Sequence, residues 1–198
     1  MEEKDTLKSA TGVLIAANLL YFLIVTIAGP TEESSVLVQW GALYTPYIED
    51  GAYWRLASAM FLHSGIRHLM NNMITLFVLG TMLEEELGKV RYVLLYLLGG
   101  LFGNAVEYAL SLRSGEAVVA VGASGAVFAV MGALIWILIV NKGRIRGMTM
   151  RKMLVMAGLS VYFGFASSGV ANGAHLGGLA AGFLLSLLLY RKRQKWYT

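Results

Sequence analysis

The feature that most constrains this chain is a series of apolar runs, each about as long as a membrane-spanning helix. The first run, residues 10–29, reads ATGVLIAANLLYFLIVTIAG and contains no charged residue. A helix needs roughly 20 mostly apolar residues to cross the hydrocarbon core of a bilayer, so such runs predict transmembrane helices. Only 14% of the 198 residues are charged, against about 25% in soluble domains. Much of the surface is therefore expected to face lipid.

We predict an all-α polytopic membrane protein, a six-helix transmembrane bundle forming a single domain over residues 1–198. The spans are expected at about 10–29, 68–85, 91–111, 121–141, 150–169 and 173–190. The segment 30–67 between the first two spans is rich in Trp and Tyr, which are typical of the membrane–water interface. It is predicted to be an interfacial loop.

The positive charges predict the orientation, because cytoplasmic loops of membrane proteins are enriched in Lys and Arg. Thirteen of the 16 basic residues fall on one side of the six-span arrangement, and only Arg55, Arg67 and Arg113 fall on the other. Both termini are therefore expected in the cytoplasm. Topology also accounts for the basic pI near 9.3, so the charge balance does not indicate nucleic-acid binding.

Polar residues inside the spans indicate the functional site, because they are costly in lipid and usually functional. With both ends inside, the second, fourth and sixth spans run from outside to inside. His68 and Asn72 open the second span, Ser124 lies about three residues into the fourth, and His175 lies about two residues into the sixth. All four are expected at a similar shallow depth below the outer surface.

Small residues indicate that the fourth and sixth spans touch, because they let helix backbones approach closely. The glycines on these two faces are Gly125, Gly132, Gly178 and Gly182. His175 precedes Gly178 by three residues and shares its face, so contact between the spans would bring Ser124 towards His175. A serine beside a histidine is the minimum arrangement for nucleophilic acyl transfer, since the imidazole takes the hydroxyl proton and later delivers it to the leaving amine.

An oxyanion site is also expected near Ser124. The serine lies in GASG at a predicted helix start, where backbone N–H groups have no intrahelical partner and the helix dipole favours negative charge. His68 and Asn72 are four residues apart, so both can donate hydrogen bonds from one helix face. Phe128 is placed to pack on the imidazole of His175. No acid is placed to orient that ring, which favours a Ser–His dyad over a triad.

Four segments together resemble the rhomboid family of intramembrane proteases. They are Trp54-Arg55, HSGIRHLMNN, GASG with Gly132 beyond it, and AHLGGLAAG. Their order and spacing are similar to those of a minimal six-span bacterial rhomboid, although Ala52 and Phe128 stand where the family often has Glu or Gln and Tyr. The resemblance implies a serine nucleophile, Ser124, a general base, His175, and an oxyanion hole made by His68, Asn72 and the Ser124 amide. It also implies supporting roles for Gly122, Gly125, Phe128, Trp54 and Arg55.

The function implied by this resemblance is an intramembrane serine endopeptidase in a bacterial inner membrane. It would form an acyl-enzyme and cut single-span proteins near the outer boundary of the membrane, where its active site would open. Its partners would be transmembrane substrates and membrane lipid, with no metal, cofactor or nucleic acid. Asn104 and Glu107, which are polar residues in the third span, are expected to have a packing or interface role.

Three other functions compete with this one. A catalytically inactive rhomboid relative could bind membrane clients without cutting them, but Ser124 and His175 are both retained. A zinc protease is disfavoured because His63 and His68 are five residues apart and no HExxH motif occurs, so the histidines do not share a helix face. A channel or transporter built on inverted repeats would show internal symmetry, and none is seen.

Overall fold

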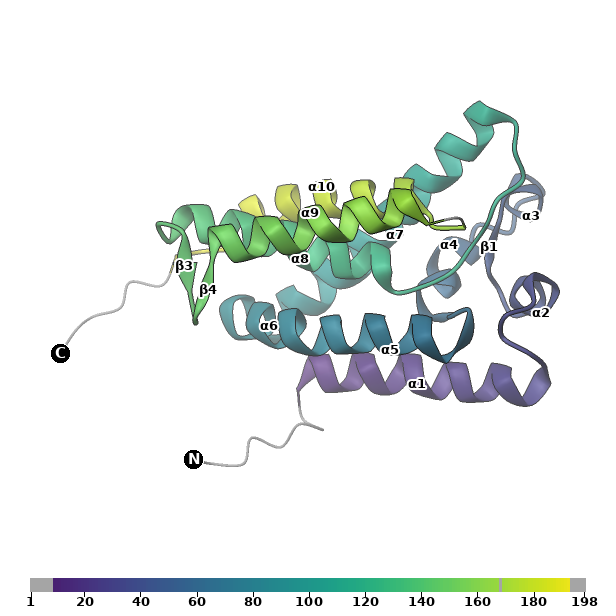
Figure 1. Ribbon diagram of the computed structural model, residues 1–198, viewed down its shortest axis with the longest axis horizontal. Coiled ribbons are helices and arrows are strands. Elements are labelled where there is room, and N and C mark those ends of the chain that lie inside the picture. The colour runs from purple at the N-terminus through teal and green to yellow at the C-terminus, as the bar shows by residue number, and fades with distance from the viewer. Residues whose placement is uncertain (1–8, 168, 193–198) are drawn as a thin grey trace.

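The computed structural model describes residues 9–167 and 169–192, and helices dominate it (Figure 1). The long helices are α1 (Ala10–Ala28), α7 (Lys89–Ser114), α8 (Ser124–Val140), α9 (Met150–Ala166) and α10 (Asn172–Leu189). One further continuous helical segment consists of α5 (Gly65–Thr75), the π-helical η3 (Leu76–Gly80) and α6 (Thr81–Leu87). The protein is therefore mostly helical, as the sequence predicts.

The segment between α1 and α5 is structured rather than irregular. It contains α2 (Ser34–Gln39), α3 (Thr45–Glu49), α4 (Arg55–Ser58) and the 3-10 turn η2 (Ala59–Phe61). Strand β1 (Leu43–Tyr44) pairs antiparallel with β2 (Val119–Ala120), and β3 (Arg144–Ile145) pairs with β4 (Met148–Thr149). The two small sheets are an addition to the predicted all-α fold.

Two helix starts differ from the predicted spans, and both differences affect the site. Residues 119–120 pair with β1 instead of continuing a helix, so Ser124 is the first residue of α8 rather than the fourth of a span. Helix α5, which corresponds to the second predicted span, begins at Gly65. His68 therefore lies in the first turn of this helix rather than at its first residue. The pairing of turns and short strands depends on partners distant in sequence, which the length of an apolar run does not reveal.

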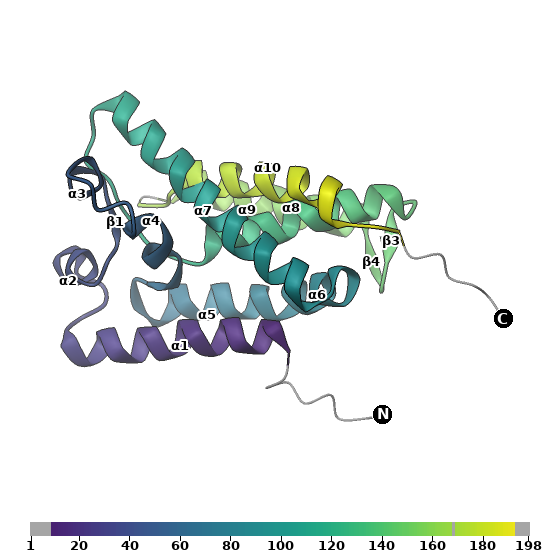
Figure 2. The same cartoon turned by 180° about the vertical axis from the view of Figure 1, so that it is seen from behind.

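Three of the described helices, α1, α7 and α10, are long and apolar enough to cross a membrane by length and composition. Helix α8 is apolar but shorter, with 17 residues. Its apolar side chains surround the whole helix, and most of them are buried. A helix that is apolar all round belongs inside a bundle, and α8 lies at the centre of this one, against α7, α9 and α10 (Figures 1 and 2).

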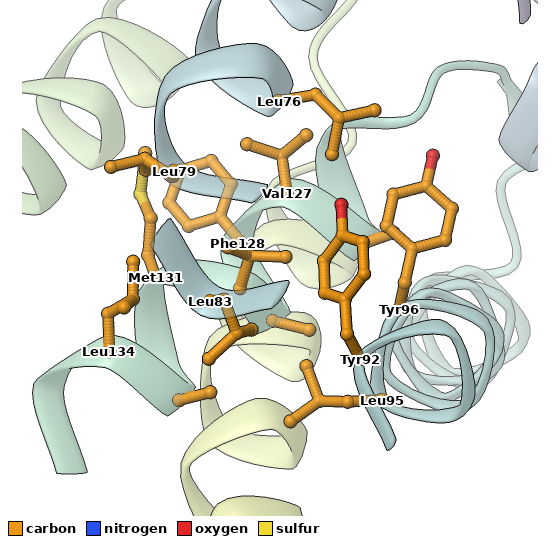
Figure 3. Packing of buried hydrophobic residues seen from close by; sticks show 14 of the residues in the cluster. Leu76, Leu79, Leu83, Tyr92, Leu95, Tyr96, Val127, Phe128, Met131 and Leu134 are labelled. Atoms are coloured by element: carbon orange, nitrogen blue, oxygen red, sulfur yellow. The ribbon is translucent and has the colours of Figure 1, made fainter. Parts of the chain in front are cut away.

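The main core lies between the η3–α6 segment, α7 and α8 (Figure 3). Leu76, Leu79 and Leu83 of the first segment pack there with Tyr92 of α7, and all four are fully buried. On the same side of the bundle, Glu84 of α6 accepts hydrogen bonds from the Ala10 amide at 2.8 Å and the Thr11 amide at 2.9 Å. These bonds satisfy free N–H groups in the first turn of α1 and join the two helices.

Glycines allow α8 and α10 to pack backbone against backbone. A Cβ atom added at Gly178 would collide with the Gly125 carbonyl oxygen, and one at Gly182 would collide with that of Ala129. In the other direction, a Cβ at Gly132 would collide with the Leu179 carbonyl oxygen. The predicted contact between the fourth and sixth apolar segments is therefore present. It sets how close the α8 and α10 backbones lie to each other.

Adding a single methyl group at this contact should destabilise the protein. Gly182→Ala should lower the free energy of unfolding by about 1–3 kcal/mol, because overpacking forces backbone shifts in a close-packed core. Thermal unfolding in detergent, followed by circular dichroism, measures the change. Gly158→Ala is the matched control, because nothing lies within 4 Å of a Cβ at Gly158 of α9. Equal melting temperatures for the two variants would show that the α8–α10 contact is not tight.

Candidate active site

Ser124 and His175 meet at the N-terminal ends of α8 and α10. The Nε2 atom of His175 lies 2.8 Å from the Ser124 hydroxyl oxygen, which is hydrogen-bonding distance. The Phe128 ring stacks on the imidazole with 4.3 Å between ring centroids and 14° between ring planes. Phe128 is one turn beyond Ser124 on α8, so the same helix supplies the hydroxyl and holds the imidazole that faces it.

The GASG turn fixes the start of α8. Gly122 has φ +127, a conformation that other residues rarely adopt, and a Cβ there would lie 2.9 Å from Nε2 of His68. The Gly122 amide donates to the Ala59 carbonyl at 2.9 Å, and the Ala123 amide donates to His63 Nε2 at 3.4 Å. The segment before α5 therefore holds the turn that presents Ser124.

The residues predicted to bind an oxyanion surround this turn. The His68 ring lies against Gly122, and Asn72 is buried one turn further along α5. The Asn72 side-chain nitrogen donates to the His68 carbonyl at 3.1 Å, which uses one of the two hydrogens of its amide group. Ser124 is the first residue of α8, so its own N–H has no intrahelical acceptor.

These residues line a cavity of about 580 Å³. Its walls come from α5, the GASG turn, α8, α9 and the start of α10. The lining residues are Ser64, Arg67, His68, Asn71, Asn72, Thr75, Val121, Ser124, Val127, Phe128, Met131, Ser160, Phe163, Gly164, Gly169, Val170, Ala171 and His175. The cavity therefore brings together His68, Asn72, Ser124, Phe128 and His175, four of which the sequence placed at matched depth.

Trp54 and Arg55 do not line this cavity. The Arg55 guanidinium is buried and donates to the carbonyls of Val38 at 2.7 Å and Ala42 at 3.0 Å. It also lies 4.8 Å from the ring centroids of both Tyr47 and Trp54. Arg55 therefore holds the segment between α1 and α5 together, and any support it gives to the site is indirect.

The sequence predicts only a general packing or interface role for Asn104 and Glu107, and the structure shows a defined contact for each. The Asn104 side chain donates to the Leu56 carbonyl at 2.8 Å, which joins α7 to α4. The Glu107 carboxylate accepts from the Ala174 amide at 3.1 Å, in the first turn of α10 and next to His175. The signal in the sequence was their polarity inside an apolar run. This polarity indicates that each side chain has a hydrogen-bond partner, but it does not identify the partner.

No carboxylate is hydrogen-bonded to His175 in the described part of the chain. Its Nδ1 atom and the Oδ1 atom of neighbouring Asn172 are both buried, and neither has a hydrogen-bond partner there. Within residues 9–167 and 169–192, no three His, Cys, Asp or Glu side chains are grouped so that they could hold a metal ion. The polar contact that this site shows at His175 is the one between its imidazole and the Ser124 hydroxyl.

His63 is the third histidine, and it lies outside the helices, between η2 and α5. Its ring is 1% exposed and meets the His68 ring edge to face at 5.2 Å. Burial, and secondly the neighbouring His68, lowers the pKa of His63 to about 3. The imidazole is therefore neutral near pH 7, as its Nε2 must be to accept the Ala123 amide hydrogen.

Acidification should therefore destabilise the fold through His63. An unfolded histidine has a pKa near 6.5, so between about pH 6.5 and 3 the unfolded chain binds a proton that the folded chain excludes. The free energy of unfolding should fall with pH in this window by up to about 1.4 kcal/mol per unit. His63→Gln should show a shallower slope in unfolding experiments from pH 7 to 4, whereas Gly158→Ala should keep the wild-type slope. An unchanged slope for His63→Gln would contradict the assignment.

The fold and site describe a multi-pass membrane protein with a serine–histidine pair, and sequence comparison identifies its family. Residues 50–192 match the Rhomboid domain. The chain is 33% identical over 179 residues to Rhomboid protease GluP of Bacillus subtilis and 33% identical over 165 residues to the putative rhomboid protease YdcA of the same organism. It is 40% identical over 162 residues to RHOMBOID-like protein 5 of Arabidopsis thaliana.

These matches cover 80–90% of this chain. They cover 81% of YdcA but only 34% of GluP and 51% of RHOMBOID-like protein 5. The chain thus spans about a third to a half of two of these relatives and most of the third. It belongs to the rhomboid family, and the match to the family domain contains all four segments whose motifs resemble that family.

Proposed function

We propose that this chain is an intramembrane serine endopeptidase that cuts transmembrane segments of single-span membrane proteins. The observation that carries the proposal is the 2.8 Å contact between Ser124 and the His175 imidazole inside a cavity of the membrane domain. Membership of the rhomboid family and the names of GluP and YdcA support the same activity.

In the proposed reaction, the Ser124 hydroxyl oxygen attacks the carbonyl carbon of the substrate while Nε2 of His175 accepts its proton. The tetrahedral intermediate collapses, the C–N bond breaks, and His175 returns the proton to the leaving amine. This leaves an acyl-enzyme ester on Ser124. A water molecule, deprotonated by His175, then attacks the ester and releases the carboxylic acid product.

The oxyanion that forms at each step would be stabilised from three directions. The donors are the Ser124 amide at the start of α8, the free hydrogen of the Asn72 amide, and the His68 ring beside Gly122. Donors that are already in place cost little reorganisation when charge develops. The bonds from Gly122 and Ala123 to the segment before α5 hold this geometry before substrate arrives.

We further propose that residues 1–198 form one six-span domain with both termini in the cytoplasm of a bacterial cell. Ser124 lies at one end of α8, and the β3–β4 hairpin with Arg144 and Arg146 lies at the other (Figure 1). The positive-inside rule puts the basic hairpin inside and the site near the outer surface. Lys4, Lys8, Arg193 and Lys195 also count towards this orientation, although they lie outside the described residues.

Water and an unwound substrate are both needed for this reaction. The helices that wall the cavity would shield Ser124 and His175 from lipid, and a position near the outer surface would give water a short path to them. A substrate helix must release its backbone hydrogen bonds before attack. Gly costs about 1 kcal/mol and Pro about 3 kcal/mol relative to Ala in a helix, so helix breakers near the outer boundary should favour cleavage.

Loss of either dyad member should abolish proteolysis. Ser124→Ala removes the nucleophile and His175→Ala removes the base, so neither variant should cut a single-span model substrate in detergent. Gel analysis and mass spectrometry of the fragments measure cleavage, and circular dichroism verifies that the variants fold. Near-normal turnover by either variant would exclude the dyad. A folded wild-type protein that binds such substrates without cutting them would instead identify an inactive rhomboid-like protein.

Two adjacent asparagines test the oxyanion hole. Asn72 is buried beside His68, whereas Asn71 lies about 100° away around the helix, exposed on the cavity wall. Asn72→Ala should lower kcat by about 10²–10³-fold, the usual cost of one oxyanion donor, with a smaller effect on KM. His68→Ala should behave similarly, and Asn71→Ala should be milder. Equal losses of kcat at positions 71 and 72 would show that the wrong helix face has been assigned.

A further inference from the structure

Helix α5 carries two exposed faces of opposite chemistry. One face is apolar and consists of Ile66, Met70 and Ile74, with Phe77 beyond the end of the helix. The other face, one residue further along the chain at each turn, consists of Arg67, Asn71 and Thr75. These residues recur at intervals of four, so each set forms a stripe along the helix. We name the second set the polar stripe.

The polar stripe faces the active-site cavity rather than lipid. All three of its residues line the cavity that contains Ser124 and His175, whereas Ile66, Met70 and Ile74 do not. Polar side chains are costly against hydrocarbon and are found facing cavities. Ser160 and Gly164 of α9 lie across the same cavity, so a substrate that reaches Ser124 between α5 and α9 would pass along the stripe.

Arg67 differs from the other residues of the cavity wall in its charge. It is the one Lys, Arg, Asp or Glu residue that lines the cavity as described, so no acidic side chain balances it there. Its guanidinium makes no ion pair or hydrogen bond with another described residue, whereas Thr75 already donates to the Asn71 carbonyl at 2.8 Å. A guanidinium offers five N–H donors in a planar fork that fits a carboxylate. The free donors of Arg67 therefore point to an anionic group brought by the substrate.

We propose that Arg67 is a specificity-determining residue that selects substrates with an Asp or Glu side chain close to the cut peptide bond. This inference rests on the proposed protease function. The carboxylate pairs with Arg67 at the rim of the cavity while the adjacent peptide bond lies at Ser124. The pair favours acidic sequences on the outer side of the cut, because Arg67 is in the first turn of α5, towards its outer end.

A lipid phosphate is the competing anion for Arg67. The exposed apolar stripe of α5 is the face that suits contact with acyl chains, and Arg67 belongs to the other stripe. A lipid headgroup in the cavity would also compete with substrate for the space in front of Ser124. The geometry thus favours a carboxylate on the substrate, and the experiment below includes conditions that separate the two anions.

The test compares matched substrates in a neutral detergent without added lipid. A single-span model substrate is prepared with Asp, Asn or Lys at each position flanking the mapped cut, and kcat/KM is measured for each. Wild-type protein should prefer Asp over Asn at one or two of these positions by about fivefold, which corresponds to about 1 kcal/mol for a solvent-exposed ion pair. Raised salt should weaken the preference.

Variants of Arg67 assign the preference to this side chain. Arg67→Gln should reduce the Asp-to-Asn ratio to about one, and Arg67→Glu should favour the Lys substrate over Asp. Arg113→Gln is the matched control, because it removes an exposed positive charge from the end of α7 and Arg113 does not line the cavity. Its ratio should equal that of the wild-type protein.

The outcomes separate this inference from the proposed function. Cleavage that requires Ser124 but shows the same Asp-to-Asn ratio in wild type and Arg67→Gln would overturn the specificity role and leave the protease assignment intact. An effect of Arg67→Gln on all substrates alike, seen only in vesicles containing phosphatidylglycerol, would assign Arg67 to a lipid headgroup and also overturn the proposal. No Ser124-dependent cleavage of any substrate would instead refute the protease function itself.

Discussion

The close approach of α8 and α10 is the constraint on which the rest of the site depends. Hydrocarbon offers no hydrophobic force to press helices together, so association inside a membrane relies on tight van der Waals packing. Gly178 and Gly182 let α10 lie directly on the α8 backbone. At that separation the Ser124 hydroxyl reaches the His175 imidazole, and Phe128 lies flat against the ring. A thicker interface would move the Ser124 hydroxyl away from the His175 imidazole.

Hydrogen bonds from outside α8 and α10 complete the arrangement. His63 and Ala59 hold the GASG turn, and Glu107 of α7 holds the first turn of α10. Each bond uses a backbone N–H at a helix start, where the intrahelical partner is missing. Inside a low-dielectric bundle such groups must be satisfied. The contacts that satisfy them therefore also fix the positions of Ser124 and His175.

Much of the site could be predicted because its residues follow rules that act along the chain. Matched depth placed His68, Asn72, Ser124 and His175 together, and the glycine spacing predicted that the fourth and sixth apolar segments touch. The exact start of α8 could not be predicted, because it is set by the pairing of β2 with β1, whose residues are distant in sequence. The partners of Asn104 and Glu107 were missed for the same reason, since polarity alone does not say which backbone group lies opposite.

The sequence by itself determined the class of protein, since apolar run length, charge asymmetry and the motifs around Ser124 and His175 are local properties. Only the tertiary structure decided which polar residues face the cavity and which serve elsewhere. Arg55 and Arg67 are both arginines of the predicted outer side, yet one is buried among the carbonyls of Val38 and Ala42 and the other lines the cavity with free donors. Their environments differ because the packing of the helices, rather than position in the sequence, sets whether a side chain is surrounded by protein, lipid or water.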